Sequence, residues 1–281
     1  MAHENLQVIA SSGGVRAEPA PARPAPRPDQ AGAPWIIAHR GDHRQAAENS
    51  LAAFDAAIHG GCDMIETDLR RCRDGIVVCH DAEAGGRPVA SMSRREIRAA
   101  TGVLPVGLDD VVERCRGYIG LNLELKEEGL EAEVLDAVRP FFEPAQYLIS
   151  SFRAGALRTV RRLAPEARTG LLSARSLASL LPSRGARPDP PSASDFLAVL
   201  GDCDADYLIP DVLDHELIDR AAAAGAALIL WYVNTGDQIR DALSHRRLAG
   251  AITDSPHLVR QALSSRSAAR GELTATPAPR P

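Results

Sequence analysis

Charged side chains and imidazoles follow three separate apolar segments of this sequence. Residues two apart in a β-strand point to the same side, so Glu66 and Asp68 would project together, as would Glu124 and Lys126. A protein core does not tolerate such groups unpaired, so the sequence predicts a metal and phosphate site. The three polar pairs are His39 with Arg40, Glu66 with Asp68, and Glu124 with Lys126.

The apolar segments before these pairs have the composition of buried strands. Runs at 35–38, 62–65 and 119–123 contain the Ile, Leu and Met residues that are typical of parallel sheets. Taken singly, acidic residues on a strand usually mark a solvated face, and a single histidine is usually structural. Here several such strands become polar at their carboxyl ends, where α/β folds keep their chemistry, and this favours a functional site.

Three carboxylates, those of Glu66, Asp68 and Glu124, stand without a cysteine or a clustered imidazole beside them. Carboxylate oxygens suit a hard divalent cation, so we expect Mg²⁺ or Ca²⁺. A zinc site would have more nitrogen or sulfur ligands.

Two histidines and two cations complete the chemical set. His39 and His80 could divide the roles of general base and general acid, while Arg40 and Lys126 supply positive charge for an anionic substrate. A metal that polarises a non-bridging oxygen, cations that neutralise charge and an acid–base pair together describe phosphodiester cleavage.

Strand-like and helix-like segments alternate along the central part of the chain. Helical patterns cover 51–58, with Ser50 as N-cap, and also 154–163 and 214–224. Eight strands alternating with helices over this length predict an α/β fold, a (β/α)₈ TIM barrel, with a doubly wound open sheet as the alternative. The expected strands are 35–38, 64–68, 120–125, 147–150, 168–172, 207–209, 228–233 and 251–253.

One segment interrupts this alternation. Only a few residues separate Asp68 from Asp74-Gly75, and a further apolar run begins at Ile76. A parallel connection needs a dozen residues or more, whereas Asp-Gly favours a hairpin turn. With the turn at 74–75, His80 would return opposite Leu69, next to Asp68, so we expect a short hairpin insertion near the active site.

The two ends of the chain have compositions that do not favour a packed fold. Proline is dense in 1–33, which predicts a disordered, partly polyproline arm, and 264–281 is small, polar and ends in proline. The barrel is therefore expected over 34–263. Within it, 173–206 is rich in Ser, Pro and Arg and predicts a long irregular excursion.

Composition limits the classes of partner. The 281 residues are 45% hydrophobic and 25% charged, with a net charge of −5, which offers no basic face for nucleic acid and no polybasic cluster for a membrane surface. No run has the apolar length of a membrane span, and we see no secretory signal. The five cysteines are odd in number and lack CxxC spacing, so we expect reduced thiols and a cytoplasmic location. Because no feature favours nucleic acid or a membrane, we expect a small-molecule substrate.

In its motifs and their order, the sequence resembles the glycerophosphodiester phosphodiesterase family. The resemblance implies a TIM barrel that hydrolyses glycerophosphodiesters to sn-glycerol 3-phosphate and an alcohol, with the glycerol 2-hydroxyl as nucleophile. It also implies that His39 and His80 are catalytic, that the three carboxylates hold the metal, and that Arg40 and Lys126 contact phosphate. The matching stretches are Ala38-His39-Arg40-Gly41, Glu48-Asn49-Ser50, Ile65-Glu66-Thr67-Asp68, Asp74-Gly75, His80-Asp81, Leu123-Glu124-Leu125-Lys126, Ser150-Ser151-Phe152, Trp231-Tyr232-Val233-Asn234 and Ile252-Thr253-Asp254.

The chain departs from the family pattern at three places. Ala47 stands where Pro is usual, Tyr232 replaces Thr, and 82–86 replaces a Leu-x-Arg-Thr-Thr run. None of these changes removes an ionisable group, but the third alters the loop beside the site and bears on substrate preference. Only residues 81–119 separate His80 from the next barrel strand, so any cap over the site should be small.

Other residues have two interpretations each. Trp231 could stack on substrate or belong to the core, and Glu48 could contact the site or favour the positive end of a helix dipole. The remaining histidines of the barrel lie in helix or loop contexts and are expected at the surface: His43, His59, His215, His245 and His257.

Three other functions share some of these features. A non-catalytic binding barrel would lack a histidine or a metal carboxylate, and none is missing. A glycosidase barrel uses paired carboxylates but does not need two histidines and Lys126. A phospholipase D-like enzyme acting on sphingomyelin or lysolipids is the nearest alternative, and an exposed apolar face around the site would favour it.

Overall fold

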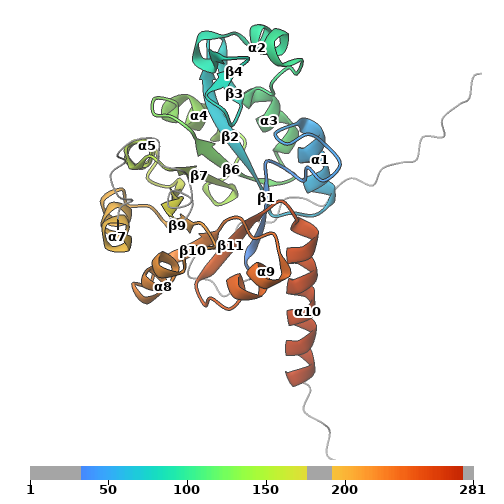
Figure 1. Cartoon of the computed structure of the whole chain (residues 1–281), viewed down its shortest axis with the longest axis vertical. Helices are drawn as coiled ribbons and strands as arrows, with labels where there is room; N and C mark the ends of the chain where they lie inside the picture. Colours follow the sequence, from blue (N-terminus) through green and yellow to red (C-terminus); the bar gives the residue numbers. More distant parts are fainter. Residues whose placement is uncertain (1–32, 176–191, 275–281) are drawn as a thin grey trace, which may run out of the picture.

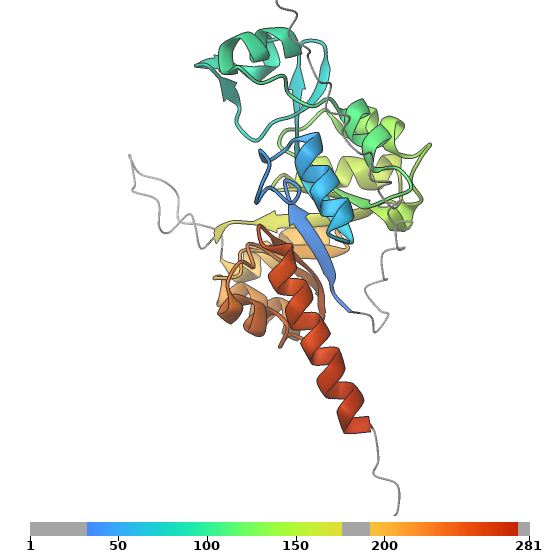
Figure 2. The same ribbon diagram turned by 90° about the vertical axis from the view of Figure 1, so that its right-hand side faces the viewer.

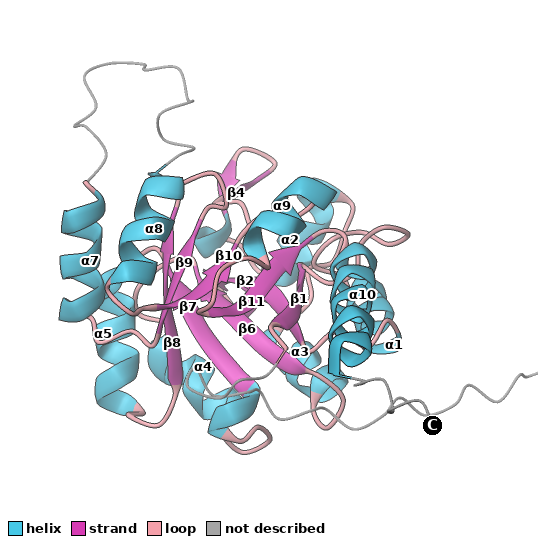
Figure 3. Cartoon of the chain, turned by 90° about the horizontal axis from the view of Figure 1, so that it is seen from below, coloured by secondary structure: helices cyan, strands magenta, loops and turns pink. Residues whose placement is uncertain are grey.

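Eight parallel strands form one closed barrel. Their order is β1-β11-β10-β9-β8-β7-β6-β2, and β2 pairs with β1 to close the ring. All eight expected strands are present, so the TIM-barrel prediction is confirmed. Seen from below, the strands lie inside a ring of helices (Figure 3). The barrel strands are β1 (Trp35–His39), β2 (Met64–Cys72), β6 (Gly120–Leu125), β7 (Tyr147–Ser151), β8 (Arg168–Ser173), β9 (Tyr207–Pro210), β10 (Ala227–Leu230) and β11 (Leu248–Thr253).

The structure, a computed structural model, describes residues 33–175 and 192–274, with 267–274 as backbone alone. The predicted disordered arm therefore lies outside the described residues except for Ala33, as does the end of the predicted tail from residue 275. The last helix runs to Thr274, past residue 263, where composition predicted the end of the barrel. The part of the helix beyond residue 263 contains Ala, Arg and Glu, which favour helix. The small and polar composition from residue 264 on therefore did not indicate where the helix ends. In Figures 1 and 2 this helix projects from the barrel.

Helices follow most of the strands and cover the outside of the barrel. The Ser50 hydroxyl accepts from the Ala53 backbone N–H at 3.2 Å and caps the first helix as predicted. None of the helices among the described residues has the length and apolarity to span a membrane. The helices of this layer are α1 (Leu51–His59), α3 (Leu108–Cys115), α4 (Glu131–Val138), α5 (Ala154–Leu163), α7 (Ala193–Asp202), α8 (His215–Ala223), α9 (Gly236–Ala242) and α10 (Pro256–Thr274), and a 3₁₀ turn at Pro144–Gln146 precedes β7.

The prediction of an irregular excursion at 173–206 is wrong for the part that forms α7. The Ser192 hydroxyl accepts from the Asp195 backbone N–H at 3.1 Å, and the Asp195 carboxylate accepts from the Ser192 backbone N–H at 3.0 Å. This reciprocal capping box is a helix start signal, and the abundance of Ser and Pro around it obscured it. Residues 176–191 lie outside the described part of the chain.

The strand β2 continues beyond the barrel as a hairpin with β3 (Gly75–Val78). The hairpin is confirmed, but its predicted register is wrong, because Leu69 pairs with Val78 and not with His80. Gly75 takes the first paired position of the returning strand instead of the second turn position, so the two-residue loop is 73–74. His80 therefore lies beyond the paired segment, although the Cys79 backbone N–H still donates to the Asp68 carbonyl at 2.9 Å.

The rest of this insertion forms a small unit beside the outer end of β2. It lies at the top of the molecule in Figures 1 and 2 and has a separate apolar cluster. The unit is small, as the length of this segment predicted for any cap. Its elements are β4 (Glu83–Ala84), β5 (Arg87–Pro88), a 3₁₀ turn (Val89–Ser91) and α2 (Arg94–Thr101). Its cluster contains Cys72, Val77, Ala84, Val89, Met92 and Ile97.

Side-chain alternation divides the barrel core in two. On β1, Ile36 and Ala38 pack toward the helices, whereas Trp35 and Ile37 pack inside the barrel. Because the alternation has a period of two, a polar residue two positions beyond an interior apolar residue also faces inward. The interior cluster contains Trp35, Ile37, Met64, Leu148, Leu172, Tyr207, Ile209, Ala227, Ile229, Trp231 and Ile252.

Candidate active site

The alternation brings polar side chains from three strands into the carboxyl end of the barrel. His39 continues the interior face of β1, Glu66 and Asp68 continue that of β2, and Glu124 lies on the matching face of β6. The strand register aligns His39 with Glu66 and Asp68 with Glu124. The polar residues that the sequence places after separate strands therefore meet in one region.

Glu66, Asp68 and Glu124 form a cluster of buried carboxylates whose oxygens lie within 4.8 Å of one another. Burial, reinforced by the charges of Asp68 and Glu124, raises the pKa of Glu66 well above its usual range. The Glu66 Oε1 atom is buried without a hydrogen-bond partner. A divalent cation would neutralise the excess charge and use this free oxygen, so the donor set fits a metal ion.

Lys126 lies between two of these carboxylates. Its Nζ atom is 2.8 Å from Asp68 Oδ1 and 2.7 Å from Glu124 Oε1. Burial alone would lower the pKa of Lys126, but the charges of Glu124 and Asp68 raise it above its ordinary value. Lys126 is also the only lysine of the sequence, and all its other Lys and Arg residues are arginines.

Arg40 occupies the turn after β1 with a φ of +54°. Its Nε is 3.1 Å from Asp68 Oδ2, its Nη1 donates to Glu48 Oε1 at 2.7 Å, and its backbone N–H donates to Glu66 Oε2 at 3.1 Å. Burial opposes the charge of Arg40, but Asp68 and Glu48 raise its pKa overall. Glu48 therefore contacts the predicted site residue Arg40, in line with the first of its two interpretations.

Asn49 belongs to the matching stretch Glu48-Asn49-Ser50, but the sequence assigned it no role at the site. Its Nδ2 donates to Asp68 Oδ2 at 2.8 Å, and its Oδ1 accepts from the Thr67 hydroxyl at 2.8 Å. Asn49 has a φ of +56°, a left-handed conformation that asparagine tolerates better than most residues. The available signal was its position directly before the N-cap Ser50, which brings the start of α1 to the barrel mouth.

His39 is buried between the carboxylate cluster and the end of β11. Its Nε2 is 3.9 Å from Glu66 Oε2, and its Nδ1 is 2.6 Å from Asp254 Oδ1. Burial lowers the pKa of His39, although the hydrogen bond to Asp254 opposes this shift. A neutral imidazole at this position can accept a proton.

His80 comes from the insertion and lines the same cavity as His39, Glu66, Glu124 and Lys126. Its side chain is 44% exposed, and its Nδ1 lies 2.9 Å from Asp81 Oδ1. Both predicted histidines thus border one cavity, one of them buried and the other open to solvent.

The cavity has a volume of about 180 Å³ and one apolar wall. The Trp231 indole N–H donates to the Ile209 carbonyl at 2.9 Å and to the Ser173 carbonyl at 3.2 Å, which fixes the ring in the barrel core. Trp231 therefore belongs to the core and also borders the cavity, and its stacking on substrate stays a prediction. The apolar wall consists of Phe152, Leu172, Trp231 and Ile252.

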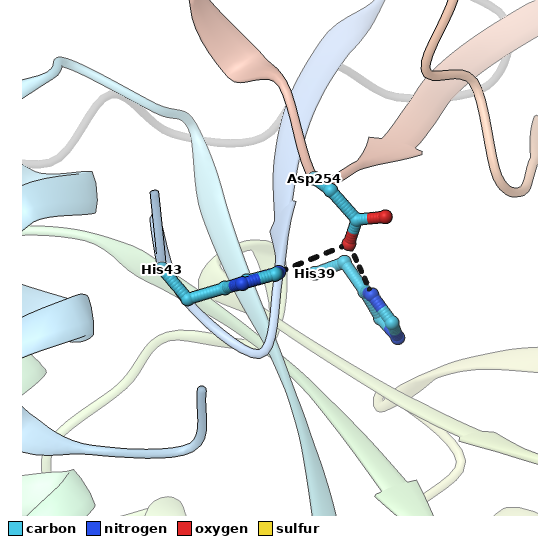
Figure 4. Close-up of side chains that lie close together, drawn as sticks. All are labelled: His39, His43 and Asp254. Carbon is cyan, nitrogen blue, oxygen red and sulfur yellow. Dashed lines mark hydrogen bonds and ion pairs between the residues drawn. The ribbon is translucent and has the colours of Figure 1, made fainter. Parts of the chain in front are cut away.

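The prediction that His43 is a surface residue is wrong. Its side chain is 25% exposed, and its Nε2 lies 3.1 Å from Asp254 Oδ1, on the same carboxylate as His39 (Figure 4). The loop after β1 returns over the barrel mouth, and no periodic pattern in the sequence records that return. His245 is half-buried, whereas His59, His215 and His257 are exposed as predicted.

A sequence profile described as the glycerophosphoryl diester phosphodiesterase family matches residues 39–109 and 120–258. The chain belongs to this family. A Mycobacterium tuberculosis relative named "Probable glycerophosphodiester phosphodiesterase 1" is 29% identical over 250 residues, which cover 74% of this chain and 85% of the relative. A glycerophosphodiester phosphodiesterase of Caldanaerobacter subterraneus is 31% identical over 159 residues, which cover 49% of this chain and 65% of the relative, just under two thirds of its length.

Solved structures share the barrel. A glycerophosphodiester phosphodiesterase from Agrobacterium tumefaciens superposes with a TM-score of 0.62 at 25% identity, covering 81% of this chain and 99% of that one. A phosphodiesterase from Oleispira antarctica, solved in complex with the product sn-glycerol-3-phosphate, gives a TM-score of 0.66 at 24% identity and covers 82% of this chain and 97% of that one.

Proposed function

We propose that this family member is a metal-dependent enzyme that hydrolyses glycerophosphodiesters to sn-glycerol 3-phosphate and an alcohol. The observation that carries the proposal is the buried cluster of Glu66, Asp68 and Glu124 beside His39 at the carboxyl end of the barrel. Family membership supports this activity, as does the glycerol phosphate product bound by the Oleispira antarctica relative.

The metal in this proposal is Mg²⁺ or Ca²⁺, held by the three carboxylates through oxygen ligands. When bound, such a cation would polarise a non-bridging oxygen of the phosphate and neutralise part of its charge. Arg40 and Lys126 already pair with Asp68 and would extend their positive charge to the same phosphate.

The two histidines then have different roles. His39, whose pKa burial lowers, takes a proton from the attacking glycerol 2-hydroxyl on Nε2, the ring nitrogen that faces Glu66. His80, which is open to solvent, gives a proton to the leaving alcohol, and the 2-oxygen closes a cyclic phosphate. In the second step water attacks the phosphorus, His80 takes a proton from the water, and His39 returns a proton to the departing 2-oxygen, which yields sn-glycerol 3-phosphate. Acid–base groups of this kind contribute roughly 10²–10⁴-fold each to the rate.

The proposed substrates are small diesters with varied alcohol groups. Arg40, Lys126 and the metal would contact only the glycerophosphate half, which all such diesters share, so head-group tolerance should be broad. A cytoplasmic location is also proposed, since all five cysteines are free thiols.

The test is a substrate panel with and without a chelator. Glycerophosphocholine, glycerophosphoethanolamine and glycerophosphoglycerol are assayed through enzymatic detection of released glycerol 3-phosphate. Chelation should abolish activity, and Mg²⁺ or Ca²⁺ should restore it. His80→Ala should reduce kcat by roughly 10²–10⁴-fold, whereas the exposed His59→Ala, on the outer helix α1, serves as the matched control. Full activity in excess chelator with no bound metal would contradict the proposal.

A phospholipase D-like activity is the second candidate, and the apolar cavity wall is the observation that favours it. Phe152 in this wall is 43% exposed, as an acyl-binding surface would require. Adding lysophosphatidylcholine and sphingomyelin to the same panel decides between the two functions. A clear preference for these lipids would replace the diester assignment.

A further inference from the structure

The carboxylate of Asp254 holds three side chains at the end of β11. Two positions beyond the interior residue Ile252, it follows the strand alternation toward the barrel interior. Its Oδ1 lies 2.6 Å from His39 Nδ1 and 3.1 Å from His43 Nε2, as Figure 4 shows, and its Oδ2 accepts from Asn234 Nδ2 at 2.6 Å.

Asn234 can present only its amino group to Asp254. Its Oδ1 accepts from the Asp254 backbone N–H at 2.8 Å and from the Thr253 hydroxyl at 3.1 Å. The oxygen side of the amide is therefore fully engaged, and the orientation of Nδ2 toward Asp254 Oδ2 is fixed. Three donors thus surround one carboxylate.

An ionised carboxylate only accepts hydrogen bonds, so the proton in the 2.6 Å contact lies on His39 Nδ1. In the neutral imidazole this leaves the lone pair on Nε2, the nitrogen directed toward Glu66. We infer that Asp254 is a positioning residue that fixes the tautomer of His39, and that Asn234 is a second positioning residue that fixes Asp254. The inference rests on the proposed function, because it explains why Nε2 of His39 is the nitrogen that accepts the proton.

His39, His43 and Asp254 also have the residue types of a zinc site. The short contact between His39 and Asp254 is that of a charge-assisted hydrogen bond, and Asn234 occupies the second carboxylate oxygen. Hydrogen bonding therefore accounts for every polar contact of this carboxylate. His43 is the weaker of the two imidazole donors, at 3.1 Å.

The variant Asp254→Asn tests the inference because Asn234 determines how the new amide turns. The Asn234 Nδ2 group still needs an acceptor, so the new side chain keeps its oxygen there and directs its amino group at His39 Nδ1. His39 must then accept at Nδ1 and carry its proton on Nε2, which removes the base. We expect kcat to fall by roughly 10²–10⁴-fold, the contribution of a general base, with little change in KM. The comparable aspartate-to-asparagine change in serine proteases lowers kcat by about 10⁴-fold.

The double variant Asn234→Asp/Asp254→Asn exchanges donor and acceptor. The new carboxylate at position 234 accepts from the new amide at position 254, whose oxygen then faces His39 Nδ1 and restores the tautomer. We expect kcat about tenfold or more above that of Asp254→Asn, although the protein carries one more substitution. If the role of Asp254 were merely structural, the second substitution should lower kcat further. A folded double variant whose kcat is no higher than that of Asp254→Asn would overturn the inference.

Asp206→Asn is the matched control for loss of a hydrogen-bonded carboxylate of similar exposure, since the Asp206 side chain is 34% exposed and that of Asp254 is 33% exposed. Asp206 accepts from Arg161 Nη2 and from the Thr169 backbone N–H, both at 2.8 Å, just before β9 at the amino end of the barrel. This change should lower Tm without changing kcat. An equal kcat loss in Asp206→Asn would show that the effect at Asp254 is a general loss of stability and would overturn the inference.

Nitrogen-15 chemical shifts of the His39 ring give a readout that does not depend on activity. The signal is assigned by comparison with His39→Gln. Wild type should show a protonated Nδ1, and Asp254→Asn a protonated Nε2. If wild type hydrolyses no diester, the proposed function fails while the tautomer result stands. If wild type carries its proton on Nε2, the inference fails whatever the activity.

Discussion

Replacing Lys126 with methionine should show how the site balances its charge without a metal. Methionine keeps a long unbranched side chain, but it leaves Asp68 Oδ1 and Glu124 Oε1 without the ammonium that lies 2.8 and 2.7 Å away. Breaking a buried ion pair by removing one partner costs about 3–5 kcal/mol. The Lys126 side chain is only 10% exposed, so solvent does little to reduce this cost. At about 2–4 °C per kcal/mol for a domain of this size, Tm should fall by about 6–20 °C.

A divalent cation should recover much of this loss, because a metal on the same carboxylates supplies the missing positive charge. The assay is thermal unfolding, followed by circular dichroism, of wild type and Lys126→Met in chelator and in saturating Mg²⁺ or Ca²⁺. The increase in Tm on adding metal should be larger in the variant. Arg114→Met is the control, since it removes a partly exposed ion pair with Asp55 on the helical layer, where such pairs contribute only about 0–1 kcal/mol.

Two results would refute this reasoning. Lys126→Met could be as stable as wild type in chelator, which would mean that the carboxylates repel one another too weakly to need the ammonium. Alternatively, metal could raise Tm no more in the variant than in wild type, which would mean that the cation and the ammonium do not act on the same charges.

Three further predictions concern the turn after β1, the cavity wall and the thiols. Gly41→Ala should greatly reduce stability and activity, because Gly41 has a φ of +83° and a Cβ there would lie 2.8 Å from the Ala53 backbone; Gly86→Ala, at φ +73° in open space, should lower the free energy of unfolding by only about 1–2 kcal/mol. Trp231→Phe loses the indole hydrogen bonds to two backbone carbonyls and should destabilise the fold by about 1–3 kcal/mol, measured by denaturant unfolding; an unchanged stability would show that water replaces the indole. Burial raises the pKa of the Cys62 and Cys115 thiols to about 12 and that of Cys72 to about 11, so at pH 8 Ellman's reagent should react with these three thiols slowly until denaturant is added. Because the chain has five free thiols, rapid reaction of more than two of them in the native protein would contradict this burial.

The barrel and the first set of site residues could be predicted because strand periodicity determines both. Apolar runs locate the strands, and a period of two carries Glu66, Asp68 and Glu124 to the interior. The same rule reaches Asp254, two positions beyond Ile252, which could have been assigned to the site on parity alone. Its contacts with His39 and Asn234 could not have been predicted, because they depend on which strand ends lie side by side in the closed ring.

Loops between the elements were less predictable, for local reasons. His43 and Asn49 lie in the segment between β1 and α1, where no repeating pattern specifies the direction of a side chain. The hairpin register was wrong because Asp-Gly identifies a turn without specifying which turn position the glycine takes, and here Gly75 begins the strand. A capping box at Ser192 was present in the sequence, but the helix that it begins, α7, has only a weak apolar face.

The lone lysine at the site has a practical consequence for chemistry on the native protein. Amine-directed acylating reagents have one side-chain target in these 281 residues, and its ammonium is buried between Asp68 and Glu124. While both carboxylates hold it, the amine has little free lone pair with which to attack. Acylation located at Lys126 by peptide mass, which separates it from acylation of the α-amino group, therefore reports opening of the charge cluster, with no substrate required.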